Sequence, residues 1–161
     1  MTDITAYIGL GSNLSNPIEQ LKIALQSIDT LPSTRLVQSS SFYGSKPLGP
    51  QDQPDFVNAV CKIKTKLSAE ELLHHLQKIE LEQGRIKKRH WGERLIDLDI
   101  LLFGDDIIST DELTVPHKQI ALRDFVLIPL AEIAPGLIIP KLGKIESLIA
   151  ALEDSYLITL D

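Results

Sequence analysis

The stretch Arg94–Gly104, RLIDLDILLFG, places two acidic residues inside a run of Leu, Ile and Phe. Successive side chains on a β-strand point to opposite faces, so parity divides this stretch into two sets. The apolar face, suited to a core, comprises Ile96, Leu98, Ile100 and Leu102. The opposite face comprises Asp97, Asp99, Leu101 and Phe103. The pattern predicts a buried strand over 95–103 with an acidic pair on one face.

Asp97 and Asp99 are the first candidates for chemistry in this chain. Alternate residues of a strand stand roughly 6–7 Å apart, and carboxylates held that close repel each other unless water or a cation lies between them. One interpretation is a solvated face near a strand end. The other is a metal site, because Mg²⁺ is held by one or two carboxylates while substrate phosphates complete its shell. The neighbouring elements must decide between the two.

The elements before this strand predict a ferredoxin-like core. Strand patterns cover 4–10, 34–43 and 56–67, and in the last of these Ala59, Cys61 and Ile63 should face inward. Helix patterns fall after the first and third strands. With the strand at 95–103 the order is β-α-β-β-α-β, an α+β fold of ferredoxin-like arrangement. A hairpin over 106–117, helices over 123–133 and 144–153, and a strand over 156–160 should extend it.

The two helices of this core carry start signals. The first should begin with Asn16 as N-cap and Pro17 in the first turn. Its apolar stripe comprises Ile18, Leu21, Leu25 and Ile28. Ser68–Glu71, SAEE, is a capping box for the second helix, and Gly84 is its expected C-cap.

Composition narrows the class of protein. The chain has 161 residues, 43% of them hydrophobic, which predicts one domain over 1–161. Its net charge of −6 argues against a general nucleic-acid binder, since such proteins usually show a basic face. One cysteine allows no intrachain disulfide. Neither a signal peptide nor a membrane span is evident, so we expect a cytoplasmic protein without a membrane partner.

A basic loop precedes the acidic strand. Five of the 16 Lys and Arg residues lie here: Arg85, Lys87, Lys88, Arg89 and Arg94. Basic side chains beside an acidic pair suit a polyphosphate, with Mg²⁺ on the carboxylates and arginine forks on the remaining phosphate oxygens. The alternative is a solvated loop whose arginines pair with the aspartates. Glu80 borders the buried stripe of the preceding helix and either reaches solvent or acts near this loop.

Aromatic residues stand where elements begin or loops run. Phe56 opens a strand, Phe125 opens a helix and Trp91 lies in the basic loop. They are either core residues or stacking surfaces for a planar ligand, whose edge Asn58 could bond because it shares a strand face with Phe56. The loop over 44–55, rich in Pro and Gly, could offer backbone groups to such a ligand. GLGSN lacks the third glycine of a dinucleotide loop, which leaves Gly11 as a point of close backbone approach.

These blocks together resemble the 6-hydroxymethyl-7,8-dihydropterin pyrophosphokinase family of folate biosynthesis. The resemblance rests on AYIGLGSNL, SSFYGSKPLGPQDQPDFVNAV, IELEQGR, HWGERLIDLDILLFG and LTVPH followed by RDFVLIPL, and it covers most of the chain. It implies transfer of pyrophosphate from ATP to the hydroxymethyl oxygen of the pterin, with AMP as the other product. ATP and the pterin would be the partners of a monomer that binds no nucleic acid.

The resemblance also implies residue roles. Asp97 and Asp99 would hold two Mg²⁺ ions, with Arg85 and Arg94 as the other catalytic residues. The ATP site would comprise Glu80, Arg85, Arg94, His117 and Arg123. The pterin site would comprise Gly11, Ser45, Leu48, Phe56, Asn58, Trp91 and Phe125, with Phe56 and Phe125 on the two faces of the ring, the backbone near Ser45 and Leu48 at its edge, and Trp91 closing the site.

Two positions depart from the family pattern, and other functions stay open. Glu112 stands where the family has a basic residue, and Lys118 follows His117 where an aromatic residue or proline is expected. Lys118 could bind the phosphate that Glu112 cannot, whereas Lys87, Lys88 and Arg89 receive no individual roles. The alternatives are a module that binds single-stranded RNA, a kinase that moves one phosphate, and an inactive relative that only binds nucleotide.

Overall fold

The computed structural model describes residues 3–12, 16–45, 56–84, 96–152 and 158–160. The predicted core is confirmed in the order β1 (Ile4–Ser12), α1 (Pro17–Asp29), β2 (Thr34–Ser39), β3 (Phe42–Ser45), β4 (Phe56–Thr65), α2 (Ala69–Gly84) and β5 (Asp97–Phe103). Strand order in the sheet is β10-β3-β4-β1-β5, with β2 also paired to β4, and all of these pairs are antiparallel.

The C-terminal part returns beneath the sheet. It comprises β6 (Ile108–Ser109), β7 (Thr114–Val115), the 3₁₀ helix η1 (Ile120–Leu122), α3 (Asp124–Ile133), β8 (Ile138–Ile139), β9 (Gly143–Lys144), α4 (Ile145–Ala150) and β10 (Ile158–Leu160). The predicted hairpin is the β6–β7 pair. The second hairpin, β8–β9, was not predicted, and α4 is shorter than the helix expected over 144–153.

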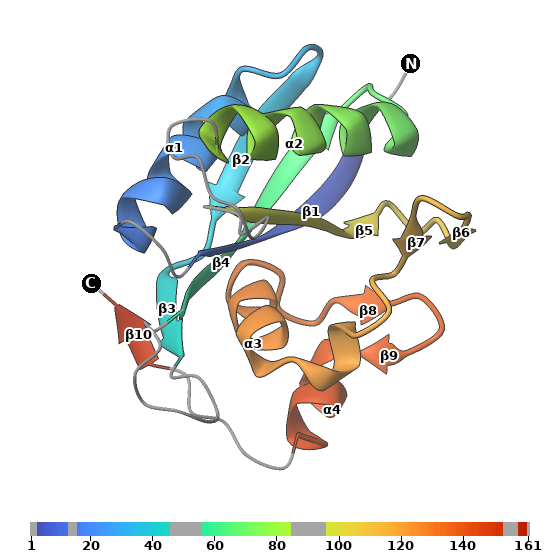
Figure 1. Cartoon of the computed structure of the whole chain (residues 1–161). Coiled ribbons are helices and arrows are strands. Elements are labelled where there is room, and N and C mark those ends of the chain that lie inside the picture. Colours follow the sequence, from blue (N-terminus) through green and yellow to red (C-terminus); the bar gives the residue numbers. More distant parts are fainter. Residues whose placement is uncertain (1–2, 13–15, 46–55, 85–95, 153–157, 161) are drawn as a thin grey trace.

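Helices cover both faces of the sheet (Figure 1). On one face α1 and α2 pack on the apolar side chains that alternate along β1, β4 and β5, among them Ile8, Ile63 and Leu98. Ala59, Cys61 and Ile63 face this core, as predicted. On the other face α3 packs against the sheet in a second core that includes Tyr7 and Val60, and α4 packs on α3 and adds Ile145 to this core. The second core covers only part of its face, and the pocket described below lies beside it.

The side chains of β5 do not alternate as predicted, because the strand contains a β-bulge. Ile96, Leu98 and Ile100 share the first core, as expected, but Leu102 lies in the second core and Phe103 in the first. The pairing with β1 shifts between Tyr7 and Ile8, so that Leu102 faces Tyr7 and Ile100 faces Ile8. Leu101 is therefore the extra residue, and an extra residue exchanges the faces of everything beyond it. Leu101 and Leu102 both point into the second core.

The start of α1 also differs from the prediction. Asn16 occupies the N-cap position, but its φ is 61° and its side chain makes no capping hydrogen bond. Ile18 is exposed rather than buried, and Gln20 takes its place on the inner face with Leu21, Ala24 and Ile28. The capping box of α2 is confirmed, because Ser68 N–H donates to Glu71 Oε1 at 2.9 Å and Glu71 N–H donates to Ser68 Oγ at 3.1 Å.

Two boundaries differ as well. The strand expected over 34–43 is divided into β2 and β3, which both pair with β4. Between them Ser40 bonds the β4 backbone, because its N–H donates to Val60 O at 2.8 Å and its Oγ accepts from Val60 N–H at 2.9 Å. In the described part of the chain, every helix is too short or too polar to cross a bilayer.

Candidate functional site

Two glycines of the central strand leave the sheet bare at one place. Gly11 lies between Asn58 of β4 and Asp97 of β5, and Gly9 lies between Val60 and Asp99. A Cβ atom on Gly11 would stand 2.9 Å from Asn58 Oδ1, closer than real Cβ contacts. Because both side chains are missing, the backbone of β1 forms the floor of the pocket between β4 and β5.

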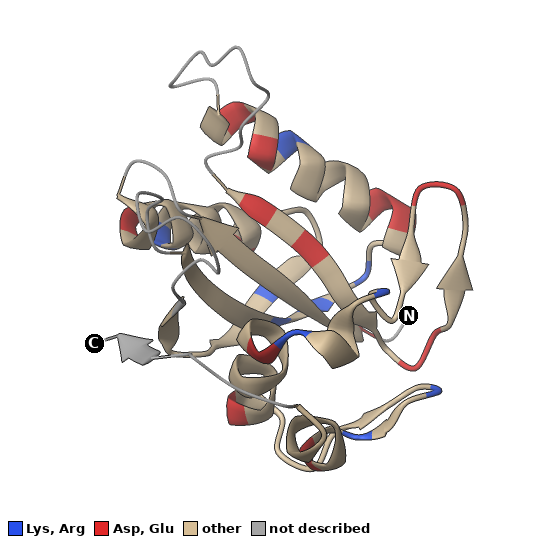
Figure 2. Cartoon of the chain, turned by 60° about the horizontal axis from the view of Figure 1, so that its bottom comes forward, with Lys and Arg blue, Asp and Glu red and all other residues tan. Residues whose placement is uncertain are grey.

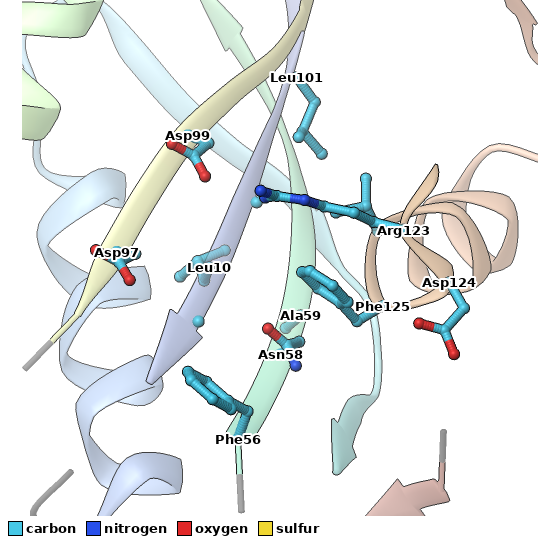
Figure 3. Close-up of a pocket in the computed structure, with 13 residues that line it drawn as sticks. Leu10, Phe56, Asn58, Ala59, Asp97, Asp99, Leu101, Arg123, Asp124 and Phe125 are labelled. Carbon is cyan, nitrogen blue, oxygen red and sulfur yellow. The ribbon is translucent and has the colours of Figure 1, made fainter. Parts of the chain in front are cut away.

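A pocket of about 380 Å³ stands on this floor. Phe56 and Asn58 rise from β4, and Phe125 comes from the first turn of α3, with both aromatic rings bordering the same space (Figure 3). Asn58 is buried, whereas 37% of Phe56 is exposed. A flat heterocycle fits such a space, because apolar walls cover its faces while a few polar groups bond its edge. The predicted grouping of Phe56, Asn58 and Phe125 is thus present in the geometry.

The two aspartates lie at the rim of the pocket on an edge strand. Both line the pocket, both are exposed, and Asp99 keeps 49% of its side chain accessible. They appear as two acidic bands along one strand in Figure 2. Between them Leu98 N–H donates to Glu80 Oε2 at 2.8 Å, which ties β5 to α2. Glu80 therefore fixes the backbone that carries the acidic pair, and it does not simply point into solvent.

His117 and Arg123 approach Asp99 from the C-terminal segment. His117 Nε2 lies 3.9 Å from Asp99 Oδ2, and its Nδ1 accepts from Gln119 N–H at 3.2 Å. Burial lowers the pKa of His117, and the nearby cations Arg123 and Lys118 lower it further, although Asp99 opposes them. The Arg123 guanidinium lies 5.3 Å from the centre of the Phe125 ring and extends toward the aspartates (Figure 3). A neutral imidazole and a cation thus face the acidic pair.

A second pocket of about 400 Å³ adjoins the first, since Asp99 and Arg123 line both. Its other walls come from α2, β5, the β6–β7 hairpin and residues 117–119, and they include Leu73, Glu112, His117 and Lys118. Glu112 Oε2 lies 3.4 Å from His74 Nε2 on the exposed rim. Glu112 and Lys118, the two residues that depart from the family pattern, therefore line the same pocket.

The structure unites predicted residues that are far apart in the sequence. Seven of them line the first pocket: Gly11, Phe56, Asn58, Asp97, Asp99, Arg123 and Phe125. Arg123 lines both pockets and His117 the second. Ser45 pairs with Phe56 in the sheet. Arg85, Leu48, Trp91 and Arg94, with the rest of the basic loop, lie outside the described residues.

Six residues that line the first pocket were not predicted: Gly9, Leu10, Ala59, Leu101, Asp124 and Val126. Gly9 lines the floor beside Gly11, Leu101 borders it, and Asp124 stands at the start of α3 next to Phe125. Strand parity alone could have placed Gly9 with Gly11, since they are two residues apart. Nothing in the sequence near Leu101 reveals the bulge, and the place of Asp124 depends on where α3 lands.

Comparisons with known sequences agree on one family. Residues 7–135 match the family model described as 7,8-dihydro-6-hydroxymethylpterin-pyrophosphokinase (HPPK). A 2-amino-4-hydroxy-6-hydroxymethyldihydropteridine pyrophosphokinase of Haemophilus influenzae is 56% identical over 158 residues, which cover 98% of this chain and 99% of the relative. The protein of the same description from Pseudomonas aeruginosa is 50% identical over 145 residues, with 90% of each chain covered.

Solved structures support the fold. The Plasmodium falciparum HPPK-DHPS, wild type with pteroate, superposes with a TM-score of 0.74 at 15% identity over 92% of this chain. The present chain spans 44% of that longer chain. With the family model, two close relatives and the shared fold in agreement, the chain belongs to the 7,8-dihydro-6-hydroxymethylpterin-pyrophosphokinase family.

Proposed function

We propose that this protein transfers pyrophosphate from ATP to the hydroxymethyl oxygen of 6-hydroxymethyl-7,8-dihydropterin, which yields AMP and the pterin diphosphate in folate biosynthesis. One observation carries the proposal beyond family membership: two adjoining pockets share Asp99 and Arg123. A transferase with two substrates needs two such spaces, with the reacting groups meeting where they join.

The first pocket is the pterin site in this proposal. The ring would lie on the glycine floor between Phe56 and Phe125, and Asn58 would bond its edge. Ser45 and Leu48 would contribute backbone groups, and Trp91 would help to close the site. Gly11 serves by lacking a side chain, since a methyl group there collides with Asn58.

The second pocket is the ATP site, with the triphosphate directed at the acidic pair. Two exposed carboxylates on one strand face are a donor set that fits Mg²⁺, which keeps several waters and takes other ligands from substrate phosphates. The described residues contain no group of three or more His, Cys, Asp or Glu side chains arranged for a metal. Asp97 and Asp99 would hold two Mg²⁺ ions, which would neutralise phosphate charge.

The protein's own residues position the reactants. The hydroxymethyl oxygen would form a bond to the β-phosphorus, the bond from that phosphorus to the bridging oxygen of AMP would break, and the hydroxyl proton would pass to solvent. Such transfers depend on alignment and charge stabilisation rather than on a protein nucleophile. Arg123, Arg85 and Arg94 would offset the phosphate charge. His117 would donate from Nε2 to a phosphate oxygen, and Glu80 would hold β5 in register beside the ATP site.

The wider assignments are proposals of the same kind. The whole chain, 1–161, would act as one pyrophosphokinase domain, a proposal supported by the near-complete coverage of the Haemophilus influenzae relative. The protein would work as a cytoplasmic monomer that uses ATP and the pterin and needs neither nucleic acid nor membrane.

The product nucleotide tests the reaction. Purified protein is incubated with ATP, Mg²⁺ and 6-hydroxymethyl-7,8-dihydropterin, and the nucleotides are separated by chromatography. We expect AMP that forms only when the pterin is present. ADP would indicate transfer of a single phosphate, and absence of any nucleotide product would leave a protein that only binds its ligands.

Variants of the acidic pair test the metal site. Asp97→Ala or Asp99→Ala should reduce kcat by at least about 100-fold, because each change removes a ligand of the Mg²⁺ ions whose charge would stabilise the transition state. Melting temperatures should change little, since both side chains are exposed. Asp105→Ala, which removes an exposed acid just beyond β5, is the matched control and should keep normal turnover. Normal turnover in either site variant would contradict the assignment.

A further inference from the structure

Glu132, in the last turn of α3, makes a set of contacts that the proposed reaction does not use. Its Oε1 accepts from the Tyr43 hydroxyl at 2.5 Å, and both carboxylate oxygens lie 3.0 Å from Ser41 N–H. Ser41 Oγ–H also donates to Oε2 at 2.9 Å. One side chain thus joins α3 to the start of β3.

The position of Glu132 is unfavourable for the helix itself. An acidic side chain near a helix C-terminus faces the negative end of the helix dipole, and α3 has no basic residue in its last turn. The hydrogen bonds to β3 therefore account for the carboxylate better than helix stability does. Tyr43 is 8% exposed as a residue, and the carboxylate supplies its hydroxyl with a hydrogen-bond acceptor.

The junction between α3 and β3, formed by Glu132 with Ser41 and Tyr43, keeps its charged acceptor and its protonated donor at neutral pH. Burial alone would raise the pKa of Glu132, but hydrogen bonds from Tyr43 and Ser41 lower it below its usual value. Burial, with the hydrogen bond and the charge of Glu132, raises the pKa of Tyr43 to about 12. The hydroxyl therefore stays protonated as donor while the carboxylate stays ionised as acceptor, which is the stronger kind of hydrogen bond.

Helical periodicity links Glu132 to the pocket. Phe125 lies seven residues earlier, two turns along α3, so the two side chains share one edge of the buried stripe formed by Val126, Leu127, Leu130 and Ile133. They stand about 10 Å apart along the axis. A rotation or slide of α3 that separated Glu132 from Tyr43 would move Phe125 as well.

Strand pairing supplies the other half of the link. Tyr43 pairs with Asn58, and Ser45 pairs with Phe56. The strand that receives Glu132 is therefore hydrogen-bonded to the strand that carries the edge-binding amide and the second aromatic wall.

We propose that Glu132 is a positioning residue for the pterin pocket: by fixing α3 against β3, it sets the gap between Phe125 and Phe56. The inference rests on the proposed function, because it assumes that the planar substrate lies between these rings. Removing the Glu132 carboxylate should loosen the pterin side of the site more than the second pocket, which shares Arg123 with the first but is otherwise lined by α2, β5, the β6–β7 hairpin and residues 117–119.

The test measures the two substrates separately. Glu132→Ala removes all of these hydrogen bonds, Glu132→Gln keeps one oxygen acceptor, and Tyr43→Phe removes the donor while keeping the ring. Each protein is titrated with 6-hydroxymethyl-7,8-dihydropterin without ATP, so that no turnover occurs, and KM for ATP and kcat are measured apart. The melting temperature reports whether each variant folds.

Glu146→Ala is the matched control. Glu132 and Glu146 are both exposed. Glu146 Oε2 accepts from Gly136 N–H at 2.9 Å, and that bond lowers the pKa of Glu146, but it joins α4 to the turn after α3 and does not reach β3. We expect the pterin Kd to rise about tenfold in Glu132→Ala, the size of one charge-assisted hydrogen bond. Glu132→Gln and Tyr43→Phe should lie between wild type and Glu132→Ala, and Glu146→Ala should match wild type.

The outcomes separate this inference from the reaction itself. A wild-type protein that neither binds the pterin nor forms AMP would overturn the proposed function and the inference with it. Normal wild-type activity with an unchanged pterin Kd in Glu132→Ala and Tyr43→Phe would overturn the inference alone. Equal weakening of pterin and ATP binding would also overturn it, because that result indicates general loosening rather than control of one pocket.

Discussion

Gly11 shows at the scale of one residue how a missing side chain makes a binding surface. Gly11→Ala should raise the pterin Kd by about tenfold or more, because the new methyl group forces Asn58 away from its position at the pocket base. Direct titration of the pterin measures the effect. ATP binding should stay near the wild-type value.

Gly84→Ala provides the control for adding a methyl group. Among the described residues, no atom outside the neighbouring turn of the helix stands within 4 Å of the Cβ that this change would add at the end of α2. Pterin binding should therefore be unchanged, and helix propensity should favour the variant slightly. Normal pterin binding in Gly11→Ala would contradict the prediction, because it would show that the pocket floor can accommodate a methyl group at this position.

Lys118 tests whether a departure from the family pattern has been compensated. Lys118→Met should raise KM for ATP about threefold to tenfold, because a cation on the wall of the second pocket would no longer attract the triphosphate. Lys22→Met, a change to an exposed lysine of α1, controls for the removal of one positive charge. If the ATP KM does not change, Lys118 does not replace the basic residue that Glu112 displaces.

At the scale of elements, the junction between α3 and β3 predicts a dependence of stability on acid. The folded protein lowers the pKa of Glu132 below its usual 4.5, so the stability that this group contributes is present above that value and is lost as pH falls through the folded pKa. The difference in melting temperature between wild type and Glu132→Gln should be largest near neutral pH and should shrink below about pH 4.5. Thermal unfolding from pH 7 to pH 3 measures it, and a difference that grows on acidification would have the wrong sign.

The same scale shows which elements the sequence could predict. The capping box at Ser68 and the alternation of β4 are both local patterns. A four-residue motif was sufficient to predict the first, and the period of two along a strand was sufficient to predict the second. The bulge at Leu101 is different, because a register shift is defined only against the partner strand β1. Asn16 also departs from its local signal, because its backbone is left-handed rather than extended as at a usual N-cap, and its side chain makes no capping hydrogen bond.

At the scale of the whole molecule, the site depends on segments that no local pattern brings together. Parity placed Asp97 with Asp99 and Phe56 with Asn58, and Phe125 was a candidate second stacking surface, but only the resemblance added His117 and Arg123 to the site. The reason is physical, because these residues meet through the packing of α3 and the β6–β7 segment against strands that come earlier in the chain. Neither the composition nor the periodicity of the sequence predicts how these segments pack against the strands. The shared lining of the two pockets was likewise visible only in three dimensions.

The glycine floor has a consequence for resistance to inhibitors. A competitive inhibitor that lies flat on Gly9 and Gly11 would touch mainly backbone, and a point mutation cannot remove backbone. The remaining escape route is to add a side chain, yet a Cβ on Gly11 would stand 2.9 Å from Asn58 Oδ1 and one on Gly9 would stand 3.3 Å from Leu101 Cδ2. A mutation that excludes the inhibitor would then exclude the substrate too. Resistance mutations on this face of the pocket should therefore also reduce the activity of the protein.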